Sequence, residues 1–469
     1  MPRILLIAAT ALLVVGVAVV VGYQARELQV FDGDDPWFVA TTALAWLLFA
    51  AAFVLLRRVP RRAALALVIG GSVLVGGAAL LGPPNTSTDS ARYAWDGIVA
   101  DAGISPYEHV PVADELAELR PNWLFSTAAT DVNGYPVCQI TRVDGTTSVP
   151  SGEPLCTAIN RPQVPTIYPP LAEIYFAAVR APVPATAEYW PFQVGGLLIS
   201  LSVTAMLLVH LLRRRADVRW VALWAWSPFV ATEAITNSHV DVLGVLLALG
   251  ASLLIASGRR VWGGIALGAA IATKLVPVIV APPLLKKRPW TVILVAVGTF
   301  ALLYVPYVLS SGLQVIGYLP GYLSEEGFDD GSRFALLSLV LPGPIALAVA
   351  VLVIAVVAAL CWWKADPRAP WTAQVVLIGT VLLVLSPHYA WYALLIIPFI
   401  VLSRRWEWLA VPAALTTGLL VYGIVATRIS LAVAVAIVLA GWWLRRRGAA
   451  AQRGQFGFGE LSLRRSARR

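Results

Sequence analysis

The chain has 469 residues, of which 59% are hydrophobic and 13% charged, and its mean hydropathy is +0.76. Soluble globular proteins carry about 25% charged residues, so these values exclude a soluble protein and predict an all-α polytopic membrane protein. The net charge of +9 does not indicate nucleic-acid binding, because Lys and Arg concentrate in short linkers between apolar runs and in a basic tail.

Three apolar runs open the chain, and a membrane-spanning helix needs about 20 such residues. We place helices near residues 4–22, 37–56 and 63–82 and take 1–82 as an N-terminal unit. The first run is longer than the apolar part of a signal peptide and has no clear cleavage site after it. The arginine-rich linker 57–62 is expected to be cytoplasmic, which places the end of the third helix outside.

A long polar segment, residues 83–190, follows and is expected to be extracytoplasmic. It contains Cys138 and Cys156, which are expected to form a disulfide if the segment faces an oxidising compartment. A zinc site is less favoured, because no CxxC or HxxxH pattern accompanies the cysteines. The stretch 168–184 is too short to span a bilayer and is expected to lie on it or dip into it.

The unit 191–445 carries the remaining predicted spans, and 446–469 is predicted to be a basic cytoplasmic tail near anionic lipid. Around 261–286, Lys274 and three prolines predict two half-length helices, which are tolerated where backbone lines a polar cavity. The total is about 14 helices, half-helices included, and every basic linker falls on one side. The other spans are expected near 191–212, 218–234, 239–256, 291–309, 334–361, 371–386, 390–403, 407–426 and 430–444.

Ionisable residues near the membrane gather on the outer side of this topology, and such residues are expensive there, which makes them candidates for function. Each also has a structural interpretation. Asp89 can cap an interfacial turn, Asp96 can be a turn residue, Lys274 can reach a headgroup, and His388 alone is more often structural. An acidic loop at 325–330 is expected to be solvated. The candidates are Asp89, Arg92, Asp96, Glu233, His239, Asp241, Lys274 and His388.

The chemistry of this set suits transfer from a phosphate. A carboxylate accepts a proton from an alcohol, whereas Lys, Arg and His hold a phosphate and stabilise it as a leaving group. Tyr93, Trp95 and Tyr168 offer rings that stack on sugars. The sequence has neither a GxxxxGK[ST] loop nor a visible Rossmann-type nucleotide-sugar domain, so a sugar donor on the outer side would arrive attached to a lipid.

Four motifs in order resemble the actinobacterial polyprenol-phosphate-mannose-dependent mannosyltransferases, which are GT-C enzymes that include lipomannan α-1,6-mannosyltransferases. They are DSARYAWDGIVADAGISPYEHVP (89–111), NRPQVPTIYPPLAEIYF (160–176), ATEAITNSHVDVL (231–243) and ATKLVPVIVAPPLL (272–285). Ser105 and Val240 stand where the family has Asn. The insertion 131–156 is unusual for the family, and we expect it to form a disulfide-closed flap.

The resemblance implies a GT-C transmembrane bundle that inverts the anomeric centre of a lipid-linked β-mannosyl phosphate. By motif position Asp89 is the base. Lys274, with Arg92 or His388, would bind the donor phosphate. The sugar and acceptor would meet Tyr93, Trp95, Asp96, Tyr168, Glu233, His239 and Asp241.

No cofactor and no metal are expected, and no nucleic-acid partner. The expected partners are a polyprenyl-phosphate sugar, a glycan or glycolipid acceptor and membrane lipids. The expected location is the plasma membrane, with both termini cytoplasmic and the active site outside. A donor carrying arabinofuranose or glucose, a flippase of a lipid-linked sugar and a non-catalytic scaffold are the alternatives.

Overall fold

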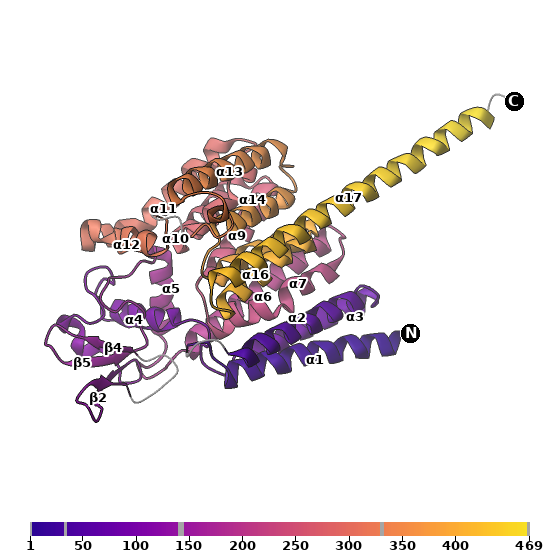
Figure 1. The fold of residues 1–469 in the computed structure, drawn as a ribbon. Helices are drawn as coiled ribbons and strands as arrows, with labels where there is room; N and C mark the ends of the chain where they lie inside the picture. The colour runs from indigo at the N-terminus through magenta and orange to yellow at the C-terminus, as the bar shows by residue number, and fades with distance from the viewer. Residues whose placement is uncertain (1, 32–34, 139–144, 329–332, 467–469) are drawn as a thin grey trace.

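The computed structural model describes residues 2–31, 35–138, 145–328 and 333–466. It is a helical bundle with a small strand-containing segment at one end (Figure 1). The chain is an all-α polytopic membrane protein. In the described residues, seven helices are long and apolar enough to cross a membrane: α1 (Arg3–Glu27), α2 (Pro36–Leu56), α3 (Arg61–Ala78), α6 (Trp190–Arg213), α11 (Pro289–Ser311), α13 (Gly343–Lys364) and α17 (Ile424–Ser466).

The outward faces of the long helices are apolar. The apolar stretches that begin at Pro289 and Gly343 bury only 11% and 17% of their residues inside the protein. Hydrocarbon lipid suits surfaces of this kind, whereas water does not. Of the nine exposed tryptophans in the described residues, seven lie close to a basic linker, as the aromatic belts of membrane proteins do: Trp262, Trp290, Trp362, Trp363, Trp406, Trp442 and Trp443.

The basic linkers contact one another in three groups. Arg219 donates to the Val59 carbonyl and Arg61 to that of Ala216. A second group joins Arg260 to the Lys287 carbonyl, and Lys286 to the carbonyls of Trp363 and Ala365. A third joins Arg445 to Glu407 and to the Arg404 carbonyl. Within each group the linkers therefore lie at the same end of the bundle, and the expectation that all of them share one side stays a prediction.

Shorter pieces fill the bundle, and several differ from the predicted spans. The expected span 218–234 is broken at Ser227–Pro228, and the pair Pro228–Thr236 and Asp241–Ala256 is bent by 115°. The pieces are η2 (Val218–Val221), α7 (Ala222–Ala225), α8 (Pro228–Val230), the π-helix η3 (Ala231–Thr236), α9 (Asp241–Ala256), α14 (Trp371–Leu385), η8 (Ala390–Ile396), α15 (Ile397–Ser403), η9 (Trp406–Leu409) and α16 (Ala410–Leu420).

The two half-helices expected around Lys274 are unequal. The first is α10 (Arg260–Thr273), whereas the second consists of the 3₁₀ turns η4 (Val276–Val280) and η5 (Pro282–Leu284). Prolines in the second half lack the N–H groups of a regular α-helix, which explains the short turns. The contact between Arg260 and Lys287 shows that the pair returns to the end where it began.

Residues 83–138 and 145–189 form the segment at the end of the bundle away from the N-terminus (Figure 1). They contain α4 (Asp89–Asp101), η1 (Asp114–Leu119) and α5 (Pro170–Arg180). A three-stranded antiparallel sheet has the order β1–β5–β4 (Phe125–Thr127, Pro154–Thr157, Gly145–Ser148), and β2 (Ala129–Thr130) pairs with β3 (Pro136–Val137).

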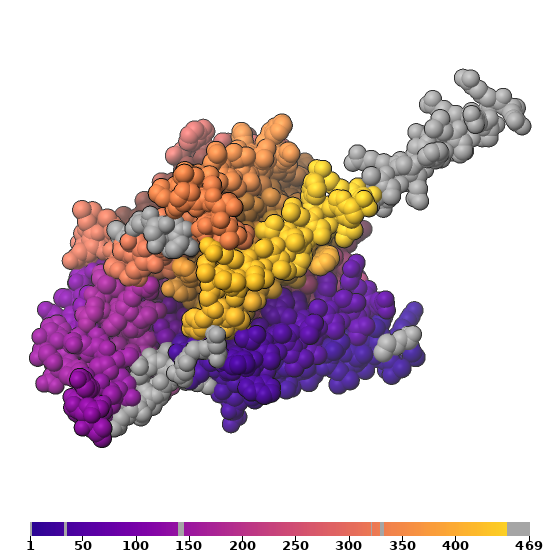
Figure 2. Space-filling model, in the orientation of Figure 1, coloured from indigo at the N-terminus to yellow at the C-terminus, as the bar shows by residue number. Residues whose placement is uncertain are grey.

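The segment between α11 and α13 covers the same end of the bundle. It comprises η6 (Gly312–Ile316), α12 (Leu319–Glu325) and η7 (Leu337–Leu339). In the space-filling view the α12 region (orange) abuts the purple segment that holds the sheet (Figure 2). The ion pair of 2.5 Å between Arg161 and Glu325 joins the two, and a hydrogen bond of 2.6 Å from Ser311, the last residue of α11, to Ser105 lies beside the junction.

Candidate active site

Asp89 is the first residue of α4, where the helix dipole favours a negative charge. The chain just before it is held by Asn237, whose side-chain oxygen accepts from the backbone N–H groups of Asn85 (2.9 Å) and Thr86 (3.0 Å). The first of the four motifs (89–111) thus begins with a helix, and the N-terminus of this helix is tied to the turn that contains His239.

Two side chains contact the Asp89 carboxylate. Asn160 Nδ2 donates to Oδ1 at 2.9 Å, and His239 Nδ1 lies 3.5 Å from Oδ2. Burial raises the pKa of Asp89, but His239, Lys274 and Asn160 together outweigh burial and hold this pKa below its ordinary value. Asp89 is therefore ionised at neutral pH, the state that a base requires.

His239 and Glu233 come from the bend between η3 and α9. Glu233 lies on the π-helix, and Ser238 has a φ of +51°, a left-handed conformation that is rare outside glycine. The turn carries His239 back toward Glu233, so that Nε2 lies 3.3 Å from Glu233 Oε2. Trp391 stacks on the imidazole with ring centroids 3.8 Å apart.

Lys274 follows the last residue of α10, and Asp241 is the first residue of α9. Lys274 Nζ lies 2.6 Å from Asp241 Oδ2 and 4.6 Å from the centroid of the Tyr392 ring. A cation at a helix C-terminus and an anion at an N-terminus are each favoured by the helix dipoles. The position of Lys274 is thus set by two helix ends and an aromatic face.

A cavity of about 270 Å³ lies between these elements. Its polar wall is formed by Asp89, Arg92, Asn160, Arg161, Lys274 and Arg333. Aromatic residues Tyr168, Tyr322, Tyr389, Trp391 and Tyr392 also line it. Its apolar wall includes Ile167, Leu275, Val276, Ile279, Leu319, Leu323, Phe328, Val381, Leu382 and Leu385. A ligand with a charged head and an apolar chain fits these two walls.

Each of the four cations on the cavity wall has a carboxylate partner. Arg92 Nε contacts both oxygens of Asp96 at 2.9 and 3.1 Å, and its other nitrogens donate to the Val164 carbonyl. Lys274 pairs with Asp241, as described above. Glu325 and Glu326, adjacent in α12 and just after it, pair with Arg161 and Arg333.

The acidic loop was expected to be solvated, and the structure differs at Glu326. Glu326 is only 2% exposed, because Arg333 neutralises it inside the protein. Glu325 is exposed but paired with Arg161 and hydrogen-bonded by the Tyr318 hydroxyl. The other two acidic residues of the loop, Asp329 and Asp330, lie outside the described residues.

Beneath Arg92 lies a buried polar cluster. The Thr166 hydroxyl donates to Glu173 Oε1 at 2.6 Å, and Glu173 is wholly buried. Burial, with the nearby charge of Asp96, raises the pKa of Glu173 well above its ordinary value. Burial therefore favours the protonated form of Glu173, and Arg92 pairs with Asp96.

Not all the predicted residues reach the cavity. Tyr93 stacks on Phe176 at 4.4 Å below Tyr168, and Trp95 packs on Phe125 in the core of the strand-containing segment. The His388 side chain is 54% exposed, and its Nδ1 lies 3.6 Å from Glu326 Oε2. The predicted residues that line the cavity are Asp89, Arg92, Tyr168 and Lys274.

The sequence reasoning missed five cavity residues of note: Asn160, Arg161, Tyr322, Arg333 and Trp391. Asn160 and Arg161 are the first two residues of the second motif (160–176), so this motif could have identified them. A φ of +55° at Arg161 marks the same position in the structure.

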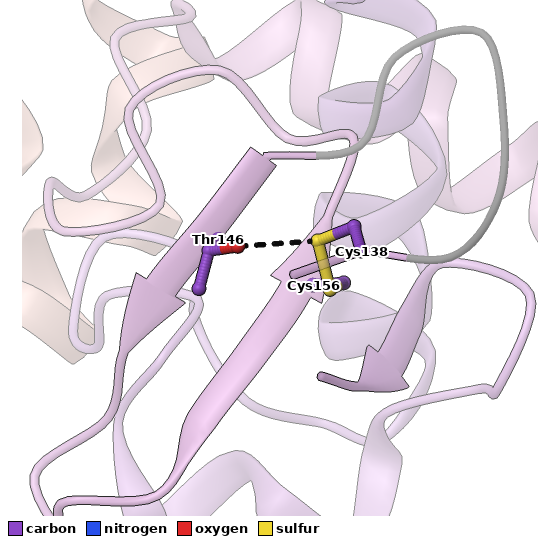
Figure 3. The surroundings of a disulfide bond; sticks show 3 residues. All are labelled: Cys138, Thr146 and Cys156. Atoms are coloured by element: carbon purple, nitrogen blue, oxygen red, sulfur yellow. Dashed lines mark hydrogen bonds between the residues drawn. A yellow bond between two sulfur atoms is a disulfide. The ribbon is translucent and has the colours of Figure 1, made fainter. Parts of the chain in front are cut away.

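The strand-containing segment positions Asn160 and Arg161, which follow β5. Cys138 and Cys156 are joined by a disulfide with Cα atoms 5.7 Å apart, and Cys156 lies within β5 (Figure 3). Thr146 Oγ1 on the neighbouring strand β4 lies 3.4 Å from Cys138 Sγ. The disulfide therefore fastens the strand that leads into the cavity wall.

The carboxylate and imidazole groups around Asp89 are not arranged to bind a metal ion. Asp89 and Glu233 lie on opposite sides of the His239 ring and do not converge on a point. Within the part of the chain that the structure describes, no group of three or more His, Cys, Asp or Glu side chains is placed to hold one.

Comparison with known proteins gives one match. Residues 166–387, slightly less than half of the chain, match the family model of glycosyltransferase family 87. The matched part carries Tyr168, Glu233, His239, Asp241 and Lys274, whereas Asp89 lies before it. No curated protein and no solved structure matches the chain. The family match indicates a glycosyltransferase.

Proposed function

We propose that the chain is an inverting glycosyltransferase that moves a mannosyl residue from polyprenyl-phosphate-mannose to a glycan or glycolipid acceptor on the outer face of the plasma membrane. The observation that carries the proposal is the cavity, where one carboxylate and four cations face an apolar wall. A phosphodiester head suits the cations, and an isoprenoid chain suits the apolar wall. The glycosyltransferase match supports the class of reaction.

In the proposed reaction Asp89 accepts the proton of the acceptor hydroxyl. The freed electron pair of that oxygen forms a bond to the anomeric carbon, from the face opposite the phosphate. The bond between the anomeric carbon and the phosphate oxygen breaks, and its electron pair stays on the polyprenyl phosphate. Positioned base catalysis of this kind contributes about 10²–10⁴-fold to a rate.

The donor phosphate would be held by Lys274 and Arg92, and we add Arg161 and Arg333 because they line the same cavity. The leaving phosphate gains negative charge, and fixed cations stabilise such charge strongly in a site that excludes water. His388 would reach the phosphate only through Glu326.

The sugar and acceptor would meet the aromatic part of the cavity. Tyr168 lines it directly, and Asp241 acts through Lys274. Tyr93 and Trp95 support this wall from behind, because they pack on α5 and on the sheet. Asp96 supports it through Arg92.

We place the basic linkers and both termini in the cytoplasm and the cavity outside. The positive-inside rule supports this orientation, as does the disulfide, because disulfides persist in oxidising compartments.

The donor sugar is tested with purified protein in nanodiscs. Radiolabelled polyprenyl phosphates carrying mannose, glucose or arabinofuranose are supplied with a short mannoside acceptor, and the product linkage is analysed. We expect transfer from the mannosyl donor. Transfer from only one of the other donors reassigns the sugar. Movement of labelled donor across proteoliposomes, without transfer from any donor, identifies a flippase and contradicts the proposal.

A further inference from the structure

His239 lies in a row between two carboxylates. Its Nδ1 is 3.5 Å from Asp89 Oδ2, and its Nε2 is 3.3 Å from Glu233 Oε2. The His239 side chain is 0% exposed, and the Trp391 ring covers one face of the imidazole. Asp89 and Trp391 line the cavity, whereas His239 and Glu233 do not. The imidazole therefore faces Asp89 rather than a ligand.

The backbone is shaped to produce this row. Glu233 lies on a π-helix, the Ser238 backbone is left-handed, and the His239 N–H donates to the Glu233 carbonyl at 3.1 Å. π-Helices and strained residues of this kind occur disproportionately at functional sites. The Asn237 amide fixes the same turn to the chain that precedes Asp89, so both ends of the row are held in one frame.

We propose that His239 and Glu233 are positioning residues for the base: His239 holds the Asp89 carboxylate ionised and aimed into the cavity, and Glu233 holds the imidazole. This proposal rests on the proposed function only for the predicted effect on sugar transfer. The predicted effect on the ionisation of Asp89 does not depend on it. The proposal differs from the sequence expectation, in which both residues touch the sugar or the acceptor. Enzymes commonly hold a reactive group with a neighbouring residue that a third residue orients in turn. Here the three are Asp89, His239 and Glu233.

A buried carboxylate is costly unless a partner offsets its charge. The His239 imidazole, 3.5 Å from Asp89 Oδ2, is such a partner for Asp89. The other groups that act on or lie beside Asp89 are Lys274 from α10, Asn160 and Tyr168 before α5, Tyr93 and Arg92 on α4, and Tyr389 before η8.

The first test measures the protonation of Asp89 without any sugar. Dicyclohexylcarbodiimide is apolar and reacts with protonated carboxyl groups, so the modified fraction of Asp89 against pH, read by mass spectrometry, reports its titration. Replacing His239 with glutamine should move the midpoint upward by about one pH unit or more, because burial then lacks its main counterweight. Glu233→Gln should move it in the same direction by less.

A matched control is His210→Gln. His210 also contacts a tryptophan, Trp371, with ring centroids 5.3 Å apart, but it lies on α6 outside the row. The midpoint of Asp89 should stay at the wild-type value in this variant. A wild-type midpoint in both His239→Gln and Glu233→Gln would overturn the proposal.

The second test uses transfer kinetics. Loss of a positioning residue should lower kcat by at least about tenfold with the acceptor KM within about twofold, because binding contacts are kept. A raised acceptor KM with unchanged kcat would overturn the proposal, since it indicates contact with the acceptor. If the wild-type protein transfers no sugar but the titration midpoint still shifts, the proposed function fails and the role of His239 stands.

Discussion

Replacing Gly97 with alanine tests how closely α4 and α5 pack. A Cβ at Gly97 would lie 2.7 Å from the carbonyl oxygen of Phe176 and 2.5 Å from Arg180 Cγ. The Arg180 side chain is not free to move, because its guanidinium donates to the carbonyls of Ala187 (2.6 Å) and Pro184 (2.9 Å). Neither neighbour yields easily, so the helices must separate.

The size of the effect follows from the contact. Ordinary van der Waals contact begins at 3.4 Å, so an oxygen at 2.7 Å must move by about 0.7 Å. Overpacking of this kind costs about 1–3 kcal/mol, and alanine returns about 1 kcal/mol through its helix propensity. We expect a net loss of stability of up to about 2 kcal/mol. Because α4 begins with Asp89, activity should fall too, by up to about 10²-fold for a displacement near 1 Å.

The assay is thermal unfolding of the detergent-purified protein, followed by size-exclusion chromatography with fluorescence detection, together with sugar transfer. The matched control is Gly70→Ala on α3, where an added Cβ meets nothing within 4 Å. This control should be as stable as the wild type or slightly more stable. If Gly97→Ala melts at or above the wild-type temperature and keeps full activity, the close contact between α4 and α5 is refuted.

Three further outcomes are expected. The double variant Cys138→Ser, Cys156→Ser should lose about 3 kcal/mol of stability in the strand-containing segment, given a sequence separation of 18. Limited proteolysis should then become insensitive to reductant, unlike that of the wild type. Glu173→Gln should keep activity within about threefold, because a carboxyl group that is already protonated is replaced by a neutral isostere; a loss of 10²-fold would contradict a neutral Glu173. Arg161→Gln should raise the KM for the lipid donor by about tenfold, the worth of one charge-assisted contact, whereas an unchanged donor KM would remove Arg161 from the phosphate site.

The long helices were predictable because the signal is local. Composition alone predicts α1, α2, α6 and α11, since a bilayer demands about 20 apolar residues in succession. Helices that lie inside the bundle need not cross the whole bilayer, so they are shorter. The predicted span 218–234 differs for this reason, because a Ser–Pro break is tolerated where other helices surround it.

The helix α4 was not predicted, since its sequence mixes Asp, Arg and Gly with aromatic residues. Its helical state depends on distant contacts, such as Phe176 against Gly97 and Asn237 against Asn85. Sequence periodicity carries no information on such contacts. The π-helix that carries Glu233 is of the same kind.

The candidate site was predictable in part. Asp89, Arg92, Tyr168 and Lys274 were expected from residue type and motif, and all four line the cavity. Glu325, by contrast, pairs with Arg161 across 164 positions of sequence, so its partner is not visible in its own neighbourhood.

Aromatic residues show the same limit. An aromatic ring that stacks on a sugar and one that fills a core look alike in sequence. Trp95 was expected at the sugar and lies in a core with Phe125. Trp391 lines the cavity and covers His239, although no motif reasoning had selected it.

The most direct measurement of the central claim is transfer by the Asp89→Asn variant. The amide keeps the shape of the side chain and its contact with Asn160 but accepts no proton. Asp114→Asn, at an exposed position of η1, is the control and should keep wild-type activity. We predict that Asp89→Asn, purified in the same detergent with the same elution profile, loses at least about 10²-fold of the wild-type rate. Turnover within tenfold of the wild type would show that another group takes the proton and would contradict the account.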